Sequence, residues 1–208
     1  MKNIFILLSL VIFLSSFQVT LPIKTYVENK NIFVSYSNGK SKQLTFNHSD
    51  SDPFILSDNA RILFIRTFKN PSSVTKKIMI VNLSDLKEVV LSGIKPYKDG
   101  LEDTNDIMNI IKPSISLDGQ YLYFLTEKYV TSSQLVKVSI KTGAWIQMFP
   151  AVFYEEIKHG NYKGCFFIGQ MLIEDRGRDL YYKLVDYSGK VLKSFSDKES
   201  MESFKKNL

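Results

Sequence analysis

The chain contains an ungapped internal repeat, and this repeat constrains its fold more than any other feature. Residues 113–125 follow the pattern of residues 53–65, sixty positions earlier. Each copy has a short apolar stretch, then Asp-Asn or Asp-Gly, then a longer apolar stretch. Asn and Gly tolerate the positive φ of tight turns, so each copy predicts a hairpin with a two-residue turn. The residues in register are Pro53/Pro113, Ile55/Ile115, Asp58/Asp118 and Phe64/Phe124.

A second repetition has a longer period. A triplet of valine, a small polar residue and an apolar residue occurs four times, at spacings of 47, 57 and 47 residues, beginning at Val34, Val81, Val138 and Val185. Each triplet is followed by turn residues and then by another apolar stretch. A period of about 40 to 50 residues with four short strands per unit is typical of β-propellers, in which each unit is one blade.

We therefore predict an all-β, β-propeller-like fold with about four blades of antiparallel strands. The 15 Phe, 11 Tyr and frequent β-branched residues also favour strands. The first blade is incomplete, with only three expected strands: 23–27, 31–36 and 41–45. The other expected strands, from the axis outward, are 53–56, 61–66, 76–82 and 88–92 in blade two; 113–116, 121–126, 134–139 and 144–148 in blade three; 152–157, 165–174, 179–187 and 191–195 in blade four.

The same register predicts the core. Apolar residues that recur at equivalent strand positions should be buried: Ile55, Phe64, Val81, Ile115, Phe124, Val138 and Val185. Cys165 is the only cysteine, so no disulfide forms within the chain, and its neighbours Phe166 and Phe167 predict that the thiol is buried.

The first twenty residues resemble a secretory signal peptide. Lys2 provides a positive charge, and the apolar run from Ile4 to Leu14 is interrupted only by Ser9. That run is too short to span a bilayer, which needs roughly 20 residues, so no stable membrane span is expected. The expected organisation is a signal peptide at 1–20, a repeat domain at 21–195 and a helical tail at 196–208. An uncleaved anchor is the alternative, and either reading predicts a periplasmic or secreted protein.

The tail has the pattern of a short helix. Ser196 and Glu199 have the spacing of a capping box, in which each side chain bonds the backbone of the other. Met201, Phe204 and Leu208 then fall on one helical face. A helix that docks on the last sheet is expected.

Charge excludes one class of partner. Without Lys2, the 27 basic residues become 26 against 21 acidic ones, a net charge of +5. These charges are scattered, whereas a nucleic-acid groove needs clustered cations with interleaved aromatic residues. We predict that the protein does not bind nucleic acid.

The chain lacks recognisable catalytic and cofactor motifs. It has no Gly-x-Ser-x-Gly elbow and no Gly-rich phosphate loop. His48 lies among Asn, Ser and Asp residues, but the spacing matches no metal-ligand pattern, and His159 precedes Gly160 in an expected turn. We predict no catalytic residues, no metal and no cofactor.

The repeats resemble the WD40-like units of TolB-type propellers, the PD40 family. In that family a blade ends in Leu-Thr, and soon afterwards come Asp-Pro, an aromatic residue, Ser-Pro-Asp-Gly and a strand that ends in Phe. Here Leu44-Thr45 precedes the segment 52–59, and the second copy is 112–119. The chain departs from the pattern at Ile55 and Ile115 in place of an aromatic residue, Ser57 and Leu117 in place of Pro, and Asn59 in place of Gly.

This resemblance implies blades but no particular activity. Family members usually carry more than four blades, so a partial propeller, an open arc or a dimer that completes the ring are all expected arrangements. An open arrangement would leave strand edges unpaired at its end blades.

Loop lengths suggest where such a protein binds. The long connections expected at 46–52, 67–75, 93–111 and 127–133 join strands on the same face of a propeller, and function concentrates in loops held by a rigid scaffold. We predict an exported binding or scaffold module whose long-loop face contacts a protein or glycan partner. The alternative is an enzyme built on a propeller platform, a hydrolase or lyase acting on a sugar or peptide. The predicted binding residues are His48, Tyr97, Lys98, Asp99, Asp106, Lys128 and Tyr129.

Overall fold

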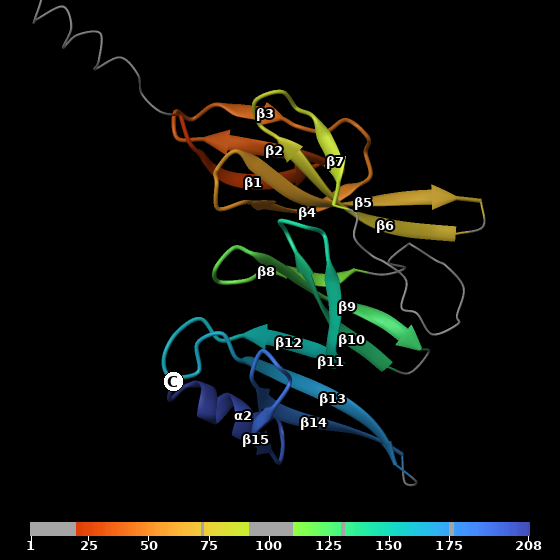
Figure 1. Ribbon diagram of the computed structural model, residues 1–208, viewed down its shortest axis with the longest axis vertical. Helices are drawn as coiled ribbons and strands as arrows, with labels where there is room; N and C mark the ends of the chain where they lie inside the picture. Colours follow the sequence, from red (N-terminus) through yellow and green to blue (C-terminus); the bar gives the residue numbers. More distant parts are fainter. Residues whose placement is uncertain (1–19, 72, 92–109, 130–131, 175–176) are drawn as a thin grey trace, which may run out of the picture.

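The computed structural model describes residues 20–71, 73–91, 110–129, 132–174 and 177–208. Within these residues, fifteen strands form four antiparallel sheets, followed by one short helix. Each sheet is one blade of the prediction, and the strands of each blade are hydrogen-bonded in chain order. The predicted all-β fold with an incomplete first blade is confirmed (Figure 1).

The observed strands fall close to the predicted ones. Blade one contains β1 (Pro22–Glu28), β2 (Asn31–Tyr36) and β3 (Ser41–Gln43). Blade two contains β4 (Asp50–Ile55), β5 (Arg61–Asn70), β6 (Ser73–Asn82) and β7 (Glu88–Val90). Blade three contains β8 (Ile111–Ile115), β9 (Tyr121–Tyr129), β10 (Ser132–Ser139) and β11 (Trp145–Pro150). Blade four contains β12 (Phe153–Glu156), β13 (Phe166–Glu174), β14 (Gly177–Val185) and β15 (Val191–Phe195).

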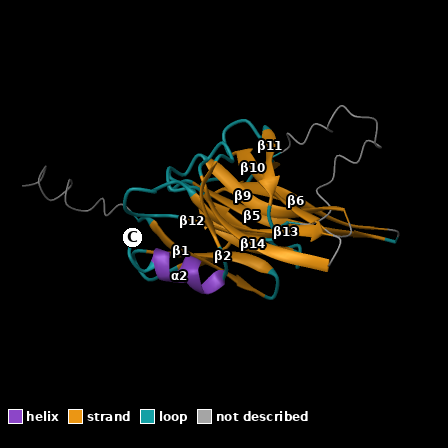
Figure 2. Cartoon of the chain, turned by 90° about the horizontal axis from the view of Figure 1, so that it is seen from below, coloured by secondary structure: helices purple, strands orange, loops and turns teal. Residues whose placement is uncertain are grey.

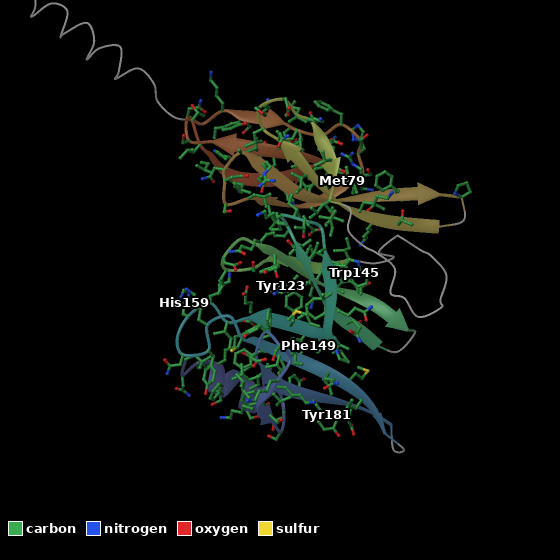
Figure 3. The ribbon with its side chains drawn as sticks, in the orientation of Figure 1. Met79, Tyr123, Trp145, Phe149, His159 and Tyr181 are labelled. Carbon is green, nitrogen blue, oxygen red and sulfur yellow. The ribbon has the colours of Figure 1, made fainter. Side chains whose placement is uncertain are left out.

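The blades stack in chain order, and a separate apolar cluster fills each interface. Because side chains alternate along a strand, each inner blade presents one apolar face to the blade before it and one to the blade after it. Met79 belongs to the cluster between blades one and two, whereas Tyr123 and Phe149 belong to that between blades three and four (Figure 3). The cluster between blades two and three includes Leu63 and Phe124.

The predicted core residues lie at these interfaces. The side chains of Phe64, Phe124, Val81, Val138 and Val185 are buried. Ile55 and Ile115 are only half-buried at the edges of these clusters, so their predicted burial is confirmed only in part. Cys165 is also only half-buried. It packs against the apolar cluster on the outer face of blade four, so the prediction that its thiol is buried is wrong.

The predicted two-residue turns of the repeat are wrong in detail. The connection after β4 is longer, because Leu56 N donates to Arg61 O across residues 57–60, and Asn59 N donates to Leu56 O. Only Asn59 has a positive φ there, and Gly119 takes the equivalent place in blade three. Asp58 and Asp118 accept hydrogen bonds from local backbone amides, as turn aspartates do.

Two of the expected long loops are mostly strand. In these segments the hairpins β5–β6 and β9–β10 continue, and their strands pair as far as Asn70 with Ser73 and Tyr129 with Ser132. Together with β13–β14, these hairpins project on the same side of the molecule (Figure 1).

The tail forms the expected helix with a different cap. Helix α2 (Lys198–Lys205) begins after Asp197, whose carboxylate accepts from Ser200 N, while the Ser200 hydroxyl completes the capping box. The predicted Ser196–Glu199 box is therefore wrong by one residue. Met201 is buried and Phe204 half-buried against the outer face of blade four, while Leu208 is 41% exposed. Figure 2 shows α2 lying along this side of the sheets.

Candidate binding site

A buried ion-pair network lies where blade one joins blade two. The Arg66 side chain, at the end of the buried part of β5, donates from Nε and Nη2 to the two Asp50 oxygens at 2.6 and 2.9 Å. Nη1 and Nη2 donate to Glu88 on β7 at 2.5 and 3.0 Å. Asn47 completes the set, because its amide oxygen, turned toward the guanidinium, lies 3.1 and 2.8 Å from the terminal nitrogens.

The network is largely buried, and its groups are paired with one another. The Asp50 side chain is 0% exposed and that of Arg66 is 8% exposed. Burial opposes the charge on Arg66, but the hydrogen bonds and charges of Asp50 and Glu88 outweigh it and raise the pKa of the guanidinium. Its carbon also lies 5.2 Å from the centre of the Phe64 ring. Arg66 therefore holds the connection between the blades in place and has no N–H left for a ligand.

Backbone bonds fix the same connection at several points. Asp50 N donates to Lys30 O and Thr67 N donates to Ser49 O, both at 2.9 Å. Ile32 N donates to the Thr45 hydroxyl at 2.9 Å, so the segment leaving blade one is tied back to β2. The segment from Phe46 to Asp52 is thus held on both sides and forms a rigid wall.

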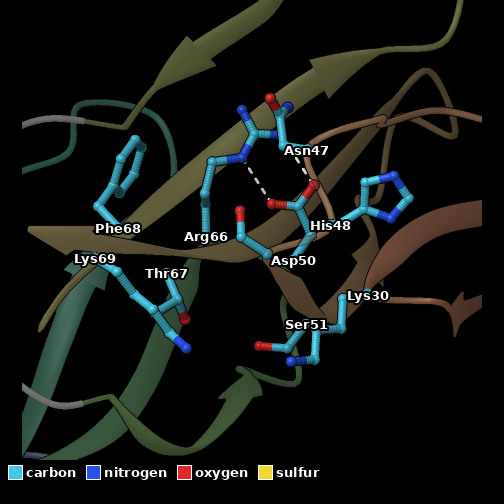
Figure 4. Close-up of a pocket in the computed structure, with 10 residues that line it drawn as sticks. Lys30, Asn47, His48, Asp50, Ser51, Arg66, Thr67, Phe68 and Lys69 are labelled. Carbon is cyan, nitrogen blue, oxygen red and sulfur yellow. Dashed lines mark hydrogen bonds and ion pairs between the residues drawn. The ribbon is translucent and has the colours of Figure 1, made fainter.

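This wall borders a cavity of about 670 Å³ (Figure 4). Its other walls come from the β1–β2 turn and from the part of β5 that extends beyond the sheet. These segments are connections between strands on the predicted long-loop face, where two of the four expected long connections meet. The lining residues are Lys30, Asn47, His48, Ser49, Asp50, Ser51, Arg66, Thr67, Phe68 and Lys69.

The free charges around the cavity are positive. Lys30 and Lys69 are exposed, and together with Arg66 they carry three positive charges against the two negative charges of Asp50 and Glu88. Hydroxyl groups of Ser49, Ser51 and Thr67 supply neutral donors and acceptors. The arrangement suits a polar ligand that carries negative charge.

His48 is the predicted binding residue that reaches this cavity. Its φ is 52°, and its backbone N–H donates to Asn31 Oδ1 at 2.9 Å. Its Nδ1 lies 3.1 Å from Asn31 Nδ2 and 3.1 Å from the Asn29 carbonyl oxygen. These contacts fix the ring against the β1–β2 turn and leave Nε2 as the nitrogen that faces other partners.

The other predicted binding residues are not among the residues that line this cavity in the part of the chain that the structure describes. Tyr97, Lys98, Asp99 and Asp106 lie outside the described residues. Lys128 and Tyr129 belong to the end of β9, in the hairpin beside that of β5 and β6. Their roles stay predictions.

Arg66 was not among the predicted site residues, although the sequence carries a signal for it. Residues 62, 64 and 66 share one face of β5, and the first two are fully buried. A charged residue in phase with a buried face needs a buried partner. Which acidic residue supplies it depends on how the blades dock.

A second polar cluster joins blades three and four. The Tyr154 hydroxyl lies 2.6 Å from Lys112 O, 2.9 Å from Tyr123 O and 2.9 Å from the Ser114 hydroxyl. Burial raises the pKa of Tyr154 to about 12. Burial, and then the charge of Asp118, also raise the pKa of Glu156. This cluster is tightly paired and serves to hold the blades together.

The other candidates stay apart from the cavity. His159 is exposed on the turn between β12 and β13 (Figure 3). Burial and the charge of Asp186 raise the pKa of the Cys165 thiol, which disfavours the nucleophilic thiolate. Among the described residues, no three His, Cys, Asp or Glu side chains are placed to hold a metal ion. In the same part of the chain, no helix is long and apolar enough to cross a membrane.

Solved structures with this architecture are β-propellers. TolB from Acinetobacter baumannii matches with a TM-score of 0.51 and 15% identity over 87% of this chain and 42% of its own. Dipeptidyl peptidase 4 from Porphyromonas gingivalis matches with a TM-score of 0.57 and 12% identity over 83% of this chain and 31% of its own. The β-propeller domain of the Trilobed protease from Pyrococcus furiosus matches with a TM-score of 0.45 and 17% identity over 71% of this chain and 42% of its own.

The similarities to TolB and to dipeptidyl peptidase 4, whose TM-scores exceed 0.5, support the propeller fold. The chain spans less than half the length of each of the three proteins. No protein-family model matches it, and neither does the sequence of any curated protein.

Proposed function

We propose that this protein is an exported binding module built on an arc of propeller blades, and that its long-loop face recognises an acidic partner, either a glycan or a protein segment. The observation that carries the proposal is the cavity beside blade two. Its walls are held by the Arg66 network, and its free charges are the ammonium groups of Lys30 and Lys69. Fixed walls with exposed cations at the rim suit a site for an anionic ligand.

Binding fits the cavity better than the alternative, a hydrolase or lyase on a propeller platform. An acid or base catalyst must be free to exchange a proton with its substrate. Both oxygens of Asp50 accept from Arg66, and the Arg66 N–H groups are divided among Asp50, Glu88 and Asn47. Arg66, Asp50 and Glu88 are therefore committed to one another.

The test compares wild type with a Lys30→Ala/Lys69→Ala variant. Both would be immobilised and exposed to acidic and neutral glycans and to the extracytoplasmic fraction. We expect the double variant to lose at least about tenfold in affinity for an acidic ligand, with strong salt dependence, because exposed charges act through screened attraction. The matched control is Lys42→Ala/Lys87→Ala, which removes two exposed cations from strand and turn positions outside the cavity. Equal binding by all three proteins would refute the role of the cavity.

A second variant tests the wider face. Replacing residues 95–109 with a short Gly-Ser linker removes Tyr97, Lys98, Asp99 and Asp106 but leaves every described strand intact. If those residues contact the partner, this variant also binds more weakly. Undiminished binding by the linker variant, with loss in the lysine variant, would confine the site to the cavity.

Export is tested separately. We expect the mature protein to begin between about Phe17 and Leu21 and to work in the periplasm or outside the cell. N-terminal sequencing of the native protein decides this, and a cytosolic species that retains Met1 would contradict it.

A further inference from the structure

The outer half of β5 has an edge that its neighbour β4 does not reach. Among the described strands, β5 pairs only with β4 on one side and β6 on the other. Pairing with β4 starts at Asp50, which lies opposite Arg66, whereas β5 continues to Asn70. Beyond Arg66, this side of β5 borders the cavity, whose lining includes residues 67–69.

One strand residue, Lys69, directs both of its backbone groups to this edge. Thr67 N donates to Ser49 O at 2.9 Å, so the Thr67 N–H points to the β4 side of β5. The N–H and C=O of a strand residue point to the same side, and this side alternates from one residue to the next. Lys69, two positions further on, therefore faces the cavity with its N–H and its C=O. Within the described part of the chain, neither group is hydrogen-bonded.

The side chains on the two faces of this edge differ in chemistry. Thr67 and Lys69 lie on one face of β5, and Phe68 lies on the other (Figure 4). Lys69 is exposed, whereas Phe68 is half-buried, with Lys77 Nζ 5.2 Å from the centre of its ring. Lys30, on the β1–β2 turn, adds a second exposed cation to the cavity. A strand added to this edge would therefore meet a positive charge on one face and an aromatic ring on the other.

From this arrangement we infer that the ligand of the cavity is an acidic protein segment, which pairs as an added strand with the free edge of β5. The inference rests on the proposed function and names a peptide, rather than a glycan, as the acidic partner. The segment runs antiparallel to β5, as β4 does, and one of its residues exchanges two hydrogen bonds with Lys69. Opposed residues share a face, so this residue is acidic, and its two apolar neighbours lie on the face of Phe68.

A protein segment fits this edge better than a glycan because the free groups are those of a strand. An extended peptide presents one donor and one acceptor together at alternate residues, which is what the N–H and C=O of Lys69 require. Its side chains then alternate between the two faces of the edge. Cations at an edge repel basic strands and attract acidic ones, so Lys69 and Lys30 select the charge of the segment.

The test compares Lys69→Pro with Lys69→Ala, because both remove the ammonium group and only proline removes the edge N–H. Proline is tolerated at an edge position whose N–H bonds no neighbouring strand, so the β5–β6 hairpin should stay paired in both variants, as circular dichroism would check. The first probe is the peptide Val-Glu-Val-Glu-Val, acetylated and amidated at its ends. The second is the same peptide with N-methylated Glu residues. The third is a disaccharide of two uronic acids, which carries the same charge as the peptide.

Calorimetric titration measures the affinity for each probe. We expect the peptide to bind Lys69→Pro about fivefold more weakly than Lys69→Ala, the effect of one lost hydrogen bond. N-methylation should weaken binding to the wild type by about tenfold, because it removes the donor that meets the Lys69 carbonyl oxygen and adds bulk there. The disaccharide should not distinguish Lys69→Pro from Lys69→Ala.

Hydrogen exchange of the Lys69 amide gives a readout that does not depend on charge. This amide should exchange more slowly when the peptide is bound and should not change with the disaccharide. If only the disaccharide binds, and Lys30→Ala/Lys69→Ala abolishes its binding, the proposed function stands and strand pairing is overturned. Pairing is also overturned if the peptide binds Lys69→Pro and Lys69→Ala equally and leaves the Lys69 amide unprotected. If none of the probes binds the wild type, the inference and the proposed function both fail.

Discussion

The first and last blades of the described structure are covered differently on their outer faces, and the difference shows how a helix can close off one end of a stack of blades. Blade four has four strands, and its outer face is covered by α2, with Phe167, Phe195 and Met201 buried beneath the helix. Blade one has three strands, and its outer face carries only half-buried aromatic residues, Tyr26 and Phe33. One end of the stack is therefore capped, whereas the other presents its outer face.

The cap also limits how the arc can grow. In stacked repeats each unit needs a neighbour to bury its apolar face, and the terminal units need a cover. Helix α2 occupies the place where a further blade would pack on blade four. Another blade could therefore pack on this face only if α2 moved away from it.

The strongest test of this comparison substitutes one aromatic residue on each outer face. Phe167→Ala should lower the free energy of unfolding by about 3–5 kcal/mol, because it leaves a cavity beneath α2. Phe33→Ala should lower it by only about 1–2 kcal/mol, since that ring is half-exposed and stacked on a single partner. Urea unfolding monitored by circular dichroism measures both. Equal losses would mean that blade one is covered in solution as well as blade four.

The next test removes the buried ion pair between Asp50 and Arg66 at the junction of blades one and two. Asp50→Ala should cost about 3 kcal/mol, at the low end for a broken buried ion pair, because Glu88 still contacts Arg66. Hydrogen exchange should accelerate in β1, β2 and β3 and stay unchanged in β13 to β15. The control Asp85→Ala removes a turn aspartate of the same blade that accepts only from Lys87 N, so it should cost much less. Uniform acceleration across all blades would contradict a local tie.

Much of the strand framework could be predicted because local chemistry determines it. The registered Pro, Asp and Phe of the repeat mark where strands begin and turn, and alternation identifies Phe64 and Phe124 as core. The lengths of the hairpins could not be predicted, because Thr67, Lys69 and Lys76 are polar and resemble a loop in the sequence. They are strand residues because β5 and β6 pair with each other beyond the body of the sheet.

The candidate site was predictable only at the level of a face. Turn lengths place the long connections on one side, and His48 lies in one of them. Arg66 lies 16 positions from Asp50 and 22 positions from Glu88 in the sequence. The three side chains meet because of how the strands dock, and no local pattern predicts this. The same is true of Lys30 and Lys69, which look like ordinary surface residues in the sequence.

A smaller effect on stability is expected from the hydrogen bonds of Tyr154 that join blades three and four. Tyr154→Phe should cost about 1 kcal/mol, because it removes the hydroxyl whose single hydrogen serves the backbone oxygens of Lys112 and Tyr123. The matched control is Tyr187→Phe, whose side chain is exposed. If Tyr154→Phe were as harmless as its control, water would satisfy these oxygens, and blade four would depend on α2 and the apolar cluster alone.

The smallest effect concerns the pH dependence of blade four. Burial and the charge of Asp118 raise the pKa of Glu156 above its ordinary value, while the Leu117 N–H and Lys158 partly oppose this. The folded state therefore keeps the proton to higher pH than the unfolded chain does. It follows that this carboxyl favours folding most below its ordinary pKa, and that this contribution is lost as pH rises through the folded pKa.

Glu156→Gln should consequently raise the urea midpoint slightly at neutral pH and leave it unchanged below about pH 4, where the carboxyl is protonated in both states. Its neighbour gives the matched control, because Glu155 points to the opposite face of β12 and pairs with Lys205 of α2. Glu155→Gln should lower the neutral-pH midpoint slightly or leave it unchanged, since exposed ion pairs contribute little. The two adjacent carboxylates would then have opposite effects on stability. The Glu156 carboxylate destabilises the fold because it is partly buried between blades three and four, whereas the Glu155 carboxylate pairs with Lys205 of α2. A gain in both variants would instead indicate that excess negative charge, and not burial at the interface, destabilises this end of the arc.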